Sequence, residues 1–488
     1  MNERSRRSFL QQSMMATASA YAISQAPLLR AQEQAALQGG SGDKLRCAII
    51  GAGGRGGSHI SAMLDRKDVT ITHICDVDEK QGGQRCQQIG KQQGSTPSLV
   101  PDIRKLLDDK TIDFVTIATP NHWHSLAAIW AVQAGKDVYV EKPVSHNVLE
   151  GRRLVQVARK HKKIVQTGTQ SRSNPGMREA MEFIHSGGIG EVKIARGLCY
   201  KRRKSIGPRG EYAVPAGVDY DLWLGPAPMK PLTRPQFHYD WHWQWDYGNG
   251  DLGNQGIHQM DLCRWALGKP NLADSVVSYG GRFGYEDAGE TANTQLVALG
   301  FGPQQLIFEV RGLETQPYKG VGVGIIIEAT KGYLVMSSYE TGVAFNEGGE
   351  VIKKFTGGGD QHHYANFLDA VRSRDHTKLN ADVEEGHLSS ALCHLGNISL
   401  RMGKQVAGAD VPAAIAEFKG NEDMVATYER TAEHLKANSL DPDKLTFSLG
   451  PQLKLDPKAE VFVGSTEANS MLSREYRKPY SLPSESEV

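Results

Sequence analysis

The 488-residue chain lacks the features that would assign it to several specialised classes of protein. Its six cysteines include no C-x-x-C pair, so the spacing of zinc sites and of dithiol redox motifs is missing, and we expect six free thiols. Lysine and arginine number 56 against 55 acidic residues, which gives no reason to expect nucleic acid or an anionic membrane as a partner. No apolar run is long enough to span a membrane stably. The composition favours a soluble protein of two domains, because the chain is longer than one core normally supports.

The first residues form a pattern typical of an export signal. Ser5-Arg6-Arg7-Ser8-Phe9-Leu10 precede a weakly apolar run, Ser13 to Leu29, which ends near small residues suited to cleavage. The paired arginines resemble a twin-arginine signal, which directs an already folded protein out of the cytoplasm. An amphipathic first helix is the alternative, although the run contains no acidic residue. We predict a signal over residues 1–31, a linker over 32–43, the twin-arginine export machinery as a partner, and a periplasmic or extracellular location.

The most informative segment is a short apolar run, 45–50, that leads directly into G-x-G-x-x-G. In this pattern Gly51 permits a tight turn, Gly53 lets the backbone approach a pyrophosphate, and Gly56 lets strand and helix pack closely. The phosphates would lie at the N-terminus of the following helix. A second apolar run, 69–75, ends at Asp76, whose carboxylate suits ribose hydroxyls and would repel a 2′-phosphate. The pattern predicts a dinucleotide fold that favours NAD over NADP, with cofactor contacts from Gly51, Gly53, Gly54, Arg55, Gly56 and Asp76.

Strand-like and helix-like segments alternate as far as residue 168. Apolar runs at 112–118, 137–140 and 163–168 are separated by helical stretches, a pattern typical of a doubly wound parallel sheet. We therefore predict an NAD(P)-binding Rossmann domain over residues 44–168. Loops at the carboxyl ends of parallel strands line the ligand crevice. We expect these loops to supply further cofactor contacts from Thr119, Pro120, Asn121, His124, Glu141, Lys142 and Gln170.

Four of these elements together resemble a known family. The glycine turn, Thr119-Pro120-Asn121, Glu141-Lys142-Pro143 and the later His258 resemble the Gfo/Idh/MocA family of sugar-type dehydrogenases over roughly residues 44–405. The resemblance implies a second α/β domain with a large, mostly antiparallel open sheet, and a sugar, polyol or related substrate between the domains. We assign residues 169–408 to this substrate and oligomerisation domain and 409–488 to a C-terminal extension that wraps the domains or completes an oligomer contact. The open sheet suggests a homodimer or homotetramer.

Oxidation of a secondary alcohol requires a base and a cation near the reacting oxygen. Histidine suits the base, and an ammonium stabilises the developing alkoxide. We predict His258 and Lys142 in these roles, which the resemblance also assigns, and a rate that falls below about pH 6.5 as His258 becomes protonated. Many family members carry aspartate where this chain has Asn254, which cannot hold a proton. Asp251 and Asp261 are the candidates to compensate, and helical spacing places Asn254, His258 and Asp261 on one face. Either the relay is shorter in this chain, or the reaction is not a simple net dehydrogenation.

The substrate contacts are predicted from aromatic and basic residues. Residues 237–247 contain three of the seven tryptophans, and aromatic faces beside polar groups suit stacking on sugars. Core packing is the alternative, since alternate residues of a strand here would face one side. We predict substrate contacts from Arg172, Trp243, Trp245 and His258. The basic loop 201–204 is either solvated or a lid over an anionic substrate. His122, His124, His238, His242 and His258 suggest a metal site, but the spacing of a zinc site is missing, so we expect none.

Three functions are consistent with these patterns. The first is an exported NAD(P)-dependent oxidoreductase that acts on a secondary hydroxyl of a sugar, glycoside or polyol. The second is a glycoside-cleaving enzyme of the same fold, in which transient oxidation by NAD drives elimination and the cofactor is regenerated. The third is a non-catalytic sugar- or nucleotide-binding protein, against which the presence of both Lys142 and His258 argues.

Overall fold

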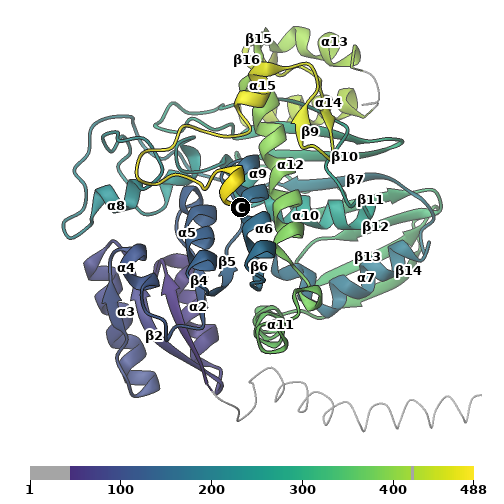
Figure 1. Ribbon diagram of the computed structural model, residues 1–488. Helices are drawn as coiled ribbons and strands as arrows, with labels where there is room; N and C mark the ends of the chain where they lie inside the picture. The colour runs from purple at the N-terminus through teal and green to yellow at the C-terminus, as the bar shows by residue number, and fades with distance from the viewer. Residues whose placement is uncertain (1–43, 419–422) are drawn as a thin grey trace, which may run out of the picture.

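The computed structural model describes residues 44–418 and 423–488 and shows two α/β domains side by side (Figure 1). The predicted signal and linker, residues 1–31 and 32–43, lie outside the described residues. No helix within the described ranges is long and apolar enough to cross a membrane. All six cysteines lie within the described residues, where each is buried and unpaired as expected.

The N-terminal domain is a six-stranded parallel sheet of order β3-β2-β1-β4-β5-β6. Its central strands β1 and β4 are almost continuously apolar because helices cover both faces of the sheet. The predicted doubly wound sheet is confirmed. Its strands are β1 (Leu45–Ile50), β2 (Val69–Cys75), β3 (Ser98–Val100), β4 (Phe114–Ile117), β5 (Asp137–Val140) and β6 (Val165–Thr167), and its helices are α2 (Gly54–Leu64), α3 (Glu79–Gln93), α4 (Ile103–Leu107), α5 (Asn121–Gln133) and α6 (Val148–Lys160).

The second domain is built on a 12-stranded sheet whose main path runs β14-β13-β12-β11-β7-β10-β9-β8-β16-β15, with β17 paired to β8 and β18 paired to β17. Only β7 and β10 pair in parallel, so the predicted mostly antiparallel sheet is confirmed. Its strands are β7 (Val192–Cys199), β8 (Ser275–Gly281), β9 (Thr294–Phe301), β10 (Gln304–Arg311), β11 (Val323–Ala329), β12 (Gly332–Met336), β13 (Thr341–Asn346), β14 (Val351–Thr356), β15 (Lys404–Ala407), β16 (Thr446–Leu449), β17 (Leu453–Asp456) and β18 (Val461–Phe462).

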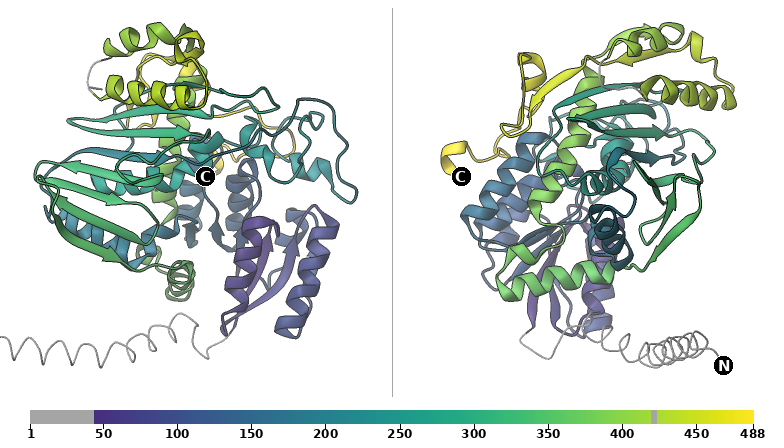
Figure 2. Two further views of the ribbon diagram at one scale, coloured as in Figure 1. Left: turned by 180° about the vertical axis from the view of Figure 1, so that it is seen from behind. Right: turned by 90° about the vertical axis from the view of Figure 1, so that its right-hand side faces the viewer.

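Helices join the large sheet to the N-terminal domain. Helix α10 packs on β7 and β11, and α12 contacts α10, β8 and, in the N-terminal domain, α6 (Figure 2). A continuous apolar core, which includes Ile257, Phe308 and Leu392, lies between these helices and the sheet. The helices and 3-10 turns of this half are η1 (Gln170–Ser173), α7 (Pro175–His185), α8 (Tyr220–Leu224), η2 (Asp240–Trp243), α9 (Gly250–Asn254), α10 (Gly256–Leu267), α11 (Asp360–Ser373), η3 (His376–Lys378), α12 (Val383–Arg401), η4 (Gly408–Asp410), α13 (Val411–Ala416), α14 (Met424–Ala437), η5 (Pro442–Lys444), α15 (Thr466–Ser470) and η6 (Glu485–Glu487).

The C-terminal segment from α14 onward contacts both domains. Strands β16 and β17 pair with β8 of the large sheet. Helix α14 adds Met424 and Tyr428 to a second apolar cluster on that sheet. The last residues then return to the N-terminal domain, where Tyr480 is buried with residues of α5 (Figure 1).

Candidate active site

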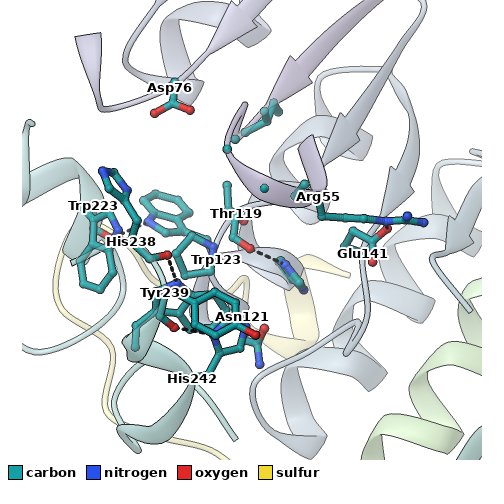
Figure 3. A pocket seen from close by; sticks show the side chains of 18 of the residues that line it. Arg55, Asp76, Thr119, Asn121, Trp123, Glu141, Trp223, His238, Tyr239 and His242 are labelled. Carbon is teal, nitrogen blue, oxygen red and sulfur yellow. Dashed lines mark hydrogen bonds and ion pairs between the residues drawn. The ribbon is translucent and has the colours of Figure 1, made fainter. Parts of the chain in front are cut away.

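One cavity of about 460 Å³ lies at the carboxyl ends of β1, β2, β4 and β5, where the two domains meet. Its size falls within the range of sites for small molecules and cofactors. Figure 3 shows Asp76 on one side of this pocket and the Arg55–Glu141 pair on another. The predicted residues that line it are Gly51, Gly53, Gly54, Arg55, Asp76, Thr119, Pro120, Asn121, His124, Glu141, Lys142, Gln170, Asn254 and His258, whereas Gly56, Arg172, Trp243, Trp245 and Asp261 do not.

The glycine turn fits a bound pyrophosphate. Gly51 has φ +82°, and a Cβ there would lie 2.8 Å from the carbonyl carbon of Ala118. A Cβ on Gly56 would lie 1.9 Å from the oxygen of Gly51, so this glycine serves the close packing of strand and helix without lining the pocket. Helix α2 begins with no side-chain cap and no acidic residue in its first turn. Its unpaired N–H groups therefore lie where an anion would be stabilised.

Asp76 lies at the end of β2 and is held by three hydrogen bonds. Its carboxylate accepts from the backbone N–H of Ala52 at 2.8 Å, from that of Asp78 at 2.9 Å, and from Gln81 Nε2 at 3.0 Å. These contacts fix the carboxylate beside the glycine turn, at the edge of the pocket. This is the position in which an acidic side chain of a dinucleotide fold contacts a ribose.

A buried carboxylate connects the glycine turn to the Glu-Lys-Pro segment. Glu141 Oε1 accepts from Arg55 Nε at 2.8 Å and lies 3.0 Å from His59 Nε2. Burial alone would raise the pKa of Glu141, but the Arg55 guanidinium and His59 outweigh it and hold that pKa well below its usual range. Arg55 also binds Asp360 at the start of α11. Glu141 is therefore an ionised anchor that holds the backbone on which Lys142 is presented.

Lys142 and His258 come from different domains and line the same pocket. The Lys142 ammonium donates to the backbone oxygen of Asn254 at 2.8 Å and lies 3.4 Å from its side-chain oxygen. Burial lowers the pKa of Lys142 to about 8, although Glu141 opposes this change. A cation that is held by neutral oxygens and is close to losing its proton suits transfer to and from a substrate hydroxyl.

His258 lies against Tyr339, with ring centroids 5.0 Å apart, and its Nδ1 is buried without a hydrogen-bond partner. Burial, followed by the charge of Lys142, lowers the pKa of His258 well below its usual range. The expected fall in rate below about pH 6.5 is therefore moved to more acidic solution, because the imidazole stays neutral there. Because Nδ1 is itself buried, a substrate hydroxyl would meet the part of the ring that lines the pocket.

Asp261 does not share the pocket with Asn254 and His258. Its carboxylate is 1% exposed and accepts both from Arg172 Nε, at 2.8 and 2.9 Å, and from Ser389 Oγ at 2.6 Å. The predicted single helical face fails because α9 ends at Asn254 and α10 starts afresh at Gly256. Arg172, predicted as a substrate contact, is occupied by the same buried ion pair.

Asp251 does not compensate for Asn254 either. Its carboxylate is bound by Arg203, with contacts of 2.7 to 3.1 Å. Lys201 donates to Gln255 at 3.0 Å, and none of the four residues of the basic loop 201–204 lines the pocket. Glu141 is a lining carboxylate whose charge acts on His258, but it is already bound by Arg55.

Trp243 and Trp245, which were predicted to contact the substrate, do not line the pocket because of the local fold. Residues 240–243 form the turn η2 in place of a strand, so the expected alternation of faces fails. Trp243 is buried with Ile206 and Ala288, and Trp245 packs under Arg401. Trp243 therefore packs in the core, which was the alternative to a substrate contact. Other aromatic residues line the pocket, namely Trp123, Trp223, His238, Tyr239, Trp241, His242 and Tyr339 (Figure 3).

The histidines that suggested a metal site bind different partners. His124 Nε2 lies 2.8 Å from the oxygen of Thr119. His122 is buried outside the pocket lining, and its Nε2 lies 3.0 Å from the oxygen of Trp223. His238 Nε2 lies 3.0 Å from a carboxylate oxygen of Asp78. Within the described part of the chain, no group of three or more histidine, cysteine or acidic side chains is arranged to hold a metal ion.

Comparison with known proteins identifies both domains. Residues 45–169 match the family model "Oxidoreductase family, NAD-binding Rossmann fold", and residues 208–435 match "Oxidoreductase family, C-terminal alpha/beta domain", both of the Gfo/Idh/MocA group. The second match ends within the extension that we placed at 409–488. Together the two matches cover more than half of the chain.

Curated relatives match over part of their length. A levoglucosan dehydrogenase of Pseudarthrobacter phenanthrenivorans is 28% identical over 178 residues, which is 36% of this chain and 38% of that protein. A glycosyl hydrolase family 109 protein of Shewanella baltica is 33% identical over 32% of this chain and 38% of its own length. An inositol 2-dehydrogenase/D-chiro-inositol 3-dehydrogenase of Lacticaseibacillus casei is 23% identical over 53% and 74%. The chain thus spans less than half of the first of these proteins.

Solved structures share the fold. Levoglucosan dehydrogenase, in complex with NADH and levoglucosan, superposes with a TM-score of 0.56 and 17% identity over 72% of this chain and 97% of that one. The WlbA dehydrogenase of Bordetella pertussis, in complex with NADH and UDP-GlcNAcA, gives 0.53 and 21% over 72% and 96%. The glycine turn, the Glu-Lys-Pro segment, the two-domain fold and both family matches agree, and the chain belongs to the Gfo/Idh/MocA oxidoreductase family.

Proposed function

We propose that the protein is a nicotinamide-dependent oxidoreductase that acts on a secondary hydroxyl of a sugar, glycoside or polyol. The observation that carries the proposal is the placement of Lys142 and His258, from two domains, in one pocket that begins at an uncapped glycine turn. The levoglucosan and inositol dehydrogenases among the relatives support the class of substrate.

The residues of the turn fit the cofactor. The N-terminus of α2 would hold the pyrophosphate, Asp76 the adenosine ribose, and the loops at 119–121 and 141–142 the nicotinamide half. A bound NAD supplies a hydride acceptor. Because Asp76 is an anion at the ribose position, we propose that NAD is preferred to NADP.

The chain's own residues would move the proton. The neutral His258, which lines the pocket, accepts the hydroxyl proton. The Lys142 ammonium, which is anchored by the backbone oxygen of Asn254, stabilises the oxygen as negative charge develops on it. Glu141 and Arg55 fix the backbone that presents Lys142.

The test is reduction of NAD followed by absorbance at 340 nm, with the purified protein and a panel of sugars, glycosides and polyols. We expect at least one member of the panel to give turnover, and the His258→Asn variant to bind NAD yet lose that turnover. Turnover that is unchanged in His258→Asn would contradict the assigned base. Failure of the wild-type protein to bind either NAD or NADP would contradict the proposal as a whole.

A second candidate is cleavage of a glycoside with no net redox change. The glycosyl hydrolase family 109 relative favours it, and so does Asn254, which removes a charge from the relay that many dehydrogenases of the family carry. Release of a free sugar from an aryl glycoside without accumulation of NADH at steady state would identify this reaction. Accumulation of NADH in step with product would identify the dehydrogenase.

The proposal extends to the cellular location of the protein and to its number of subunits. We propose that the N-terminal segment directs export of the folded protein by the twin-arginine route to the periplasm or the cell exterior, and that the chain forms a homodimer or homotetramer. Export can be tested by fractionating cells that express either the wild-type chain or the Arg6→Lys/Arg7→Lys variant. Only the wild-type chain should reach the periplasmic fraction. Equal export of the two proteins would contradict this route.

A further inference from the structure

The wall of the pocket nearest Asp76 is closed by a segment of the second domain, which we call the cover segment, residues 217–242. It contributes Leu222, Trp223 and His238 to the lining (Figure 3). It is also attached to the residues just after β2. Glu79 N donates to Gly217 O at 3.0 Å, Asp219 N donates to Val77 O at 2.9 Å, and His238 lies 3.0 Å from Asp78. The cover segment therefore lies over the end of the pocket where the adenosine of a cofactor would bind.

A second segment holds the cover segment from outside. We call this the strap, residues 471–488, the part of the chain drawn in yellow that returns to α5 and α6 (Figure 1). The guanidinium of Arg477 donates to the backbone oxygen of Gly225 at 2.9 Å and to both the carboxylate and the backbone oxygen of Asp221, at 2.6 and 2.7 Å. One strap residue thus binds the cover segment through three donors.

The strap is anchored to the N-terminal domain through Tyr480. This side chain is 2% exposed, and its ring lies 5.5 Å from that of Trp123 and 6.2 Å from that of Trp130. Trp123 in turn lines the pocket and donates from Nε1 to the backbone oxygens of Leu222 and Trp223, at 3.1 Å each. Strap, α5 and cover segment meet at this one indole.

The strap also reaches the segment that follows Glu-Lys-Pro. Tyr476 donates to Glu150 at 3.0 Å, and Arg474 lies 3.2 Å from His146 and donates to the backbone oxygen of Asp246 at 2.9 Å. Glu150 is 1% exposed, and this burial raises its pKa to about 7. The strap lies beyond residue 435, where the second family match ends.

We propose that Arg477 and Tyr480 are positioning residues that keep the cover segment closed over the adenosine half of the cofactor, so that release of the cofactor requires the strap to detach. The inference rests on the proposed function, because it assumes that a nicotinamide dinucleotide occupies the pocket. Closing contacts of this kind slow dissociation more than they change association, since the ligand leaves only when they break. The expected consequence is a cofactor that stays bound through many turnovers.

The test measures the dissociation rate of NADH from the full chain, followed by nicotinamide fluorescence after mixing with excess NAD. We expect Arg477→Ala and Tyr480→Ala each to raise this rate at least about tenfold. Lys478→Ala removes the same charge from an exposed neighbour on the strap and should leave the rate within about twofold of the wild type. Circular dichroism checks that each variant is folded.

The cover segment offers an independent variant. Asp221→Ala changes an exposed side chain and removes only the carboxylate partner of Arg477, so it should raise the rate by less than Arg477→Ala does. The double variant should dissociate no faster than Arg477→Ala alone, because that variant already removes this contact. Equal dissociation rates in the wild type, Arg477→Ala, Tyr480→Ala and Asp221→Ala would overturn the inference and leave the proposed function intact. A wild-type protein that binds neither NADH nor NAD would overturn both.

Discussion

The two sides of the pocket differ in whether backbone or side chains form them. The cofactor side is mostly backbone, because it consists of a glycine turn, an uncapped helix N-terminus and the ends of parallel strands, all within residues 50–142. The substrate side is made of side chains from other segments of the chain, such as Asn254, His258 and Tyr339. Substitutions on the first side should therefore act on folding and cofactor binding, and those on the second on rate and substrate choice.

The largest effect should come from the residue at which the two sides meet. Lys142→Met removes the cation beside the reacting oxygen but leaves the glycine turn untouched, so turnover should fall by about 10²–10³-fold while NAD binding changes little. Stopped-flow turnover and calorimetry measure the two quantities. Lys193→Met, an exposed lysine on β7, is the control. Turnover within twofold of the wild type would remove Lys142 from the chemistry.

The glycine turn should show the opposite separation. Gly51→Ala places a Cβ 2.8 Å from backbone atoms at φ +82°, so we expect a weakened fold and at least about a 100-fold loss of NAD affinity. Gly83→Ala is the matched control, since its Cβ would meet nothing within 4 Å inside α3 and should be neutral or slightly stabilising. Calorimetry and thermal unfolding test this pair. An unchanged affinity for NAD in Gly51→Ala would contradict the role of the glycine turn in cofactor binding.

The pH dependence sharpens the role of the substrate side. The pKa of Lys142 lies at about 8, so as pH rises through 8 the ammonium loses its proton and kcat/KM should fall. The pKa of His258 lies well below its usual range, so the imidazole stays neutral as pH falls and kcat/KM should hold below pH 6.5. Lys142→Arg, which keeps its charge, should move the alkaline limb upward. An acid limb centred at pH 6.5 would contradict the burial of His258.

The choice between NAD and NADP depends on one carboxylate of the cofactor side. Asp76→Ser removes the charge that would repel a 2′-phosphate, so the ratio of the Kd values for NADP and NAD should fall by about tenfold. Asp65→Ser removes an exposed charge just after α2 and should leave the ratio unchanged. A wild-type protein that prefers NADP would contradict the reading of Asp76.

The smallest effects on catalysis should come from Trp243 and Trp245, which do not line the pocket. Trp243→Ala should lower the free energy of unfolding by about 3–5 kcal/mol, because the side chain is buried with Ile206 and Ala288, and should change KM only through folding. Trp245→Ala should cost about 1 kcal/mol or less, since it loses mainly its contact with Arg401. Chemical denaturation and steady-state kinetics measure both. A rise in KM with unchanged stability in either variant would restore that tryptophan as a substrate contact.

The difference between the two sides also explains what could be predicted from the sequence. The order of strands and helices in the N-terminal domain follows from apolar runs and glycines, and loops at one end of parallel strands must meet. For that reason Asp76, Asn121 and Lys142 were predicted at one pocket and are found there. Local rules suffice where backbone geometry determines the site.

The substrate side could not be predicted in the same way. Trp243 and its neighbours were read as a strand, but Asp240–Trp243 form a 3-10 turn, which changes the face on which each ring lies. The prediction that Asp261 shares one helical face with Asn254 and His258 was wrong, because the helix is interrupted at Gln255. Tyr339 gives no signal in the sequence, since it reaches His258 only through the turn between β12 and β13. Such contacts depend on tertiary packing and not on local pattern.

The central claim is that a nicotinamide dinucleotide occupies the pocket between the two domains. Mass spectrometry of the small molecules released when the purified protein is denatured tests it most directly, with calorimetric titration of NAD and NADH into the native protein alongside. We expect about one nicotinamide nucleotide per chain, retained through purification because the strap and cover segment enclose it. A protein that releases no such nucleotide and binds neither NAD nor NADH when they are added would contradict it.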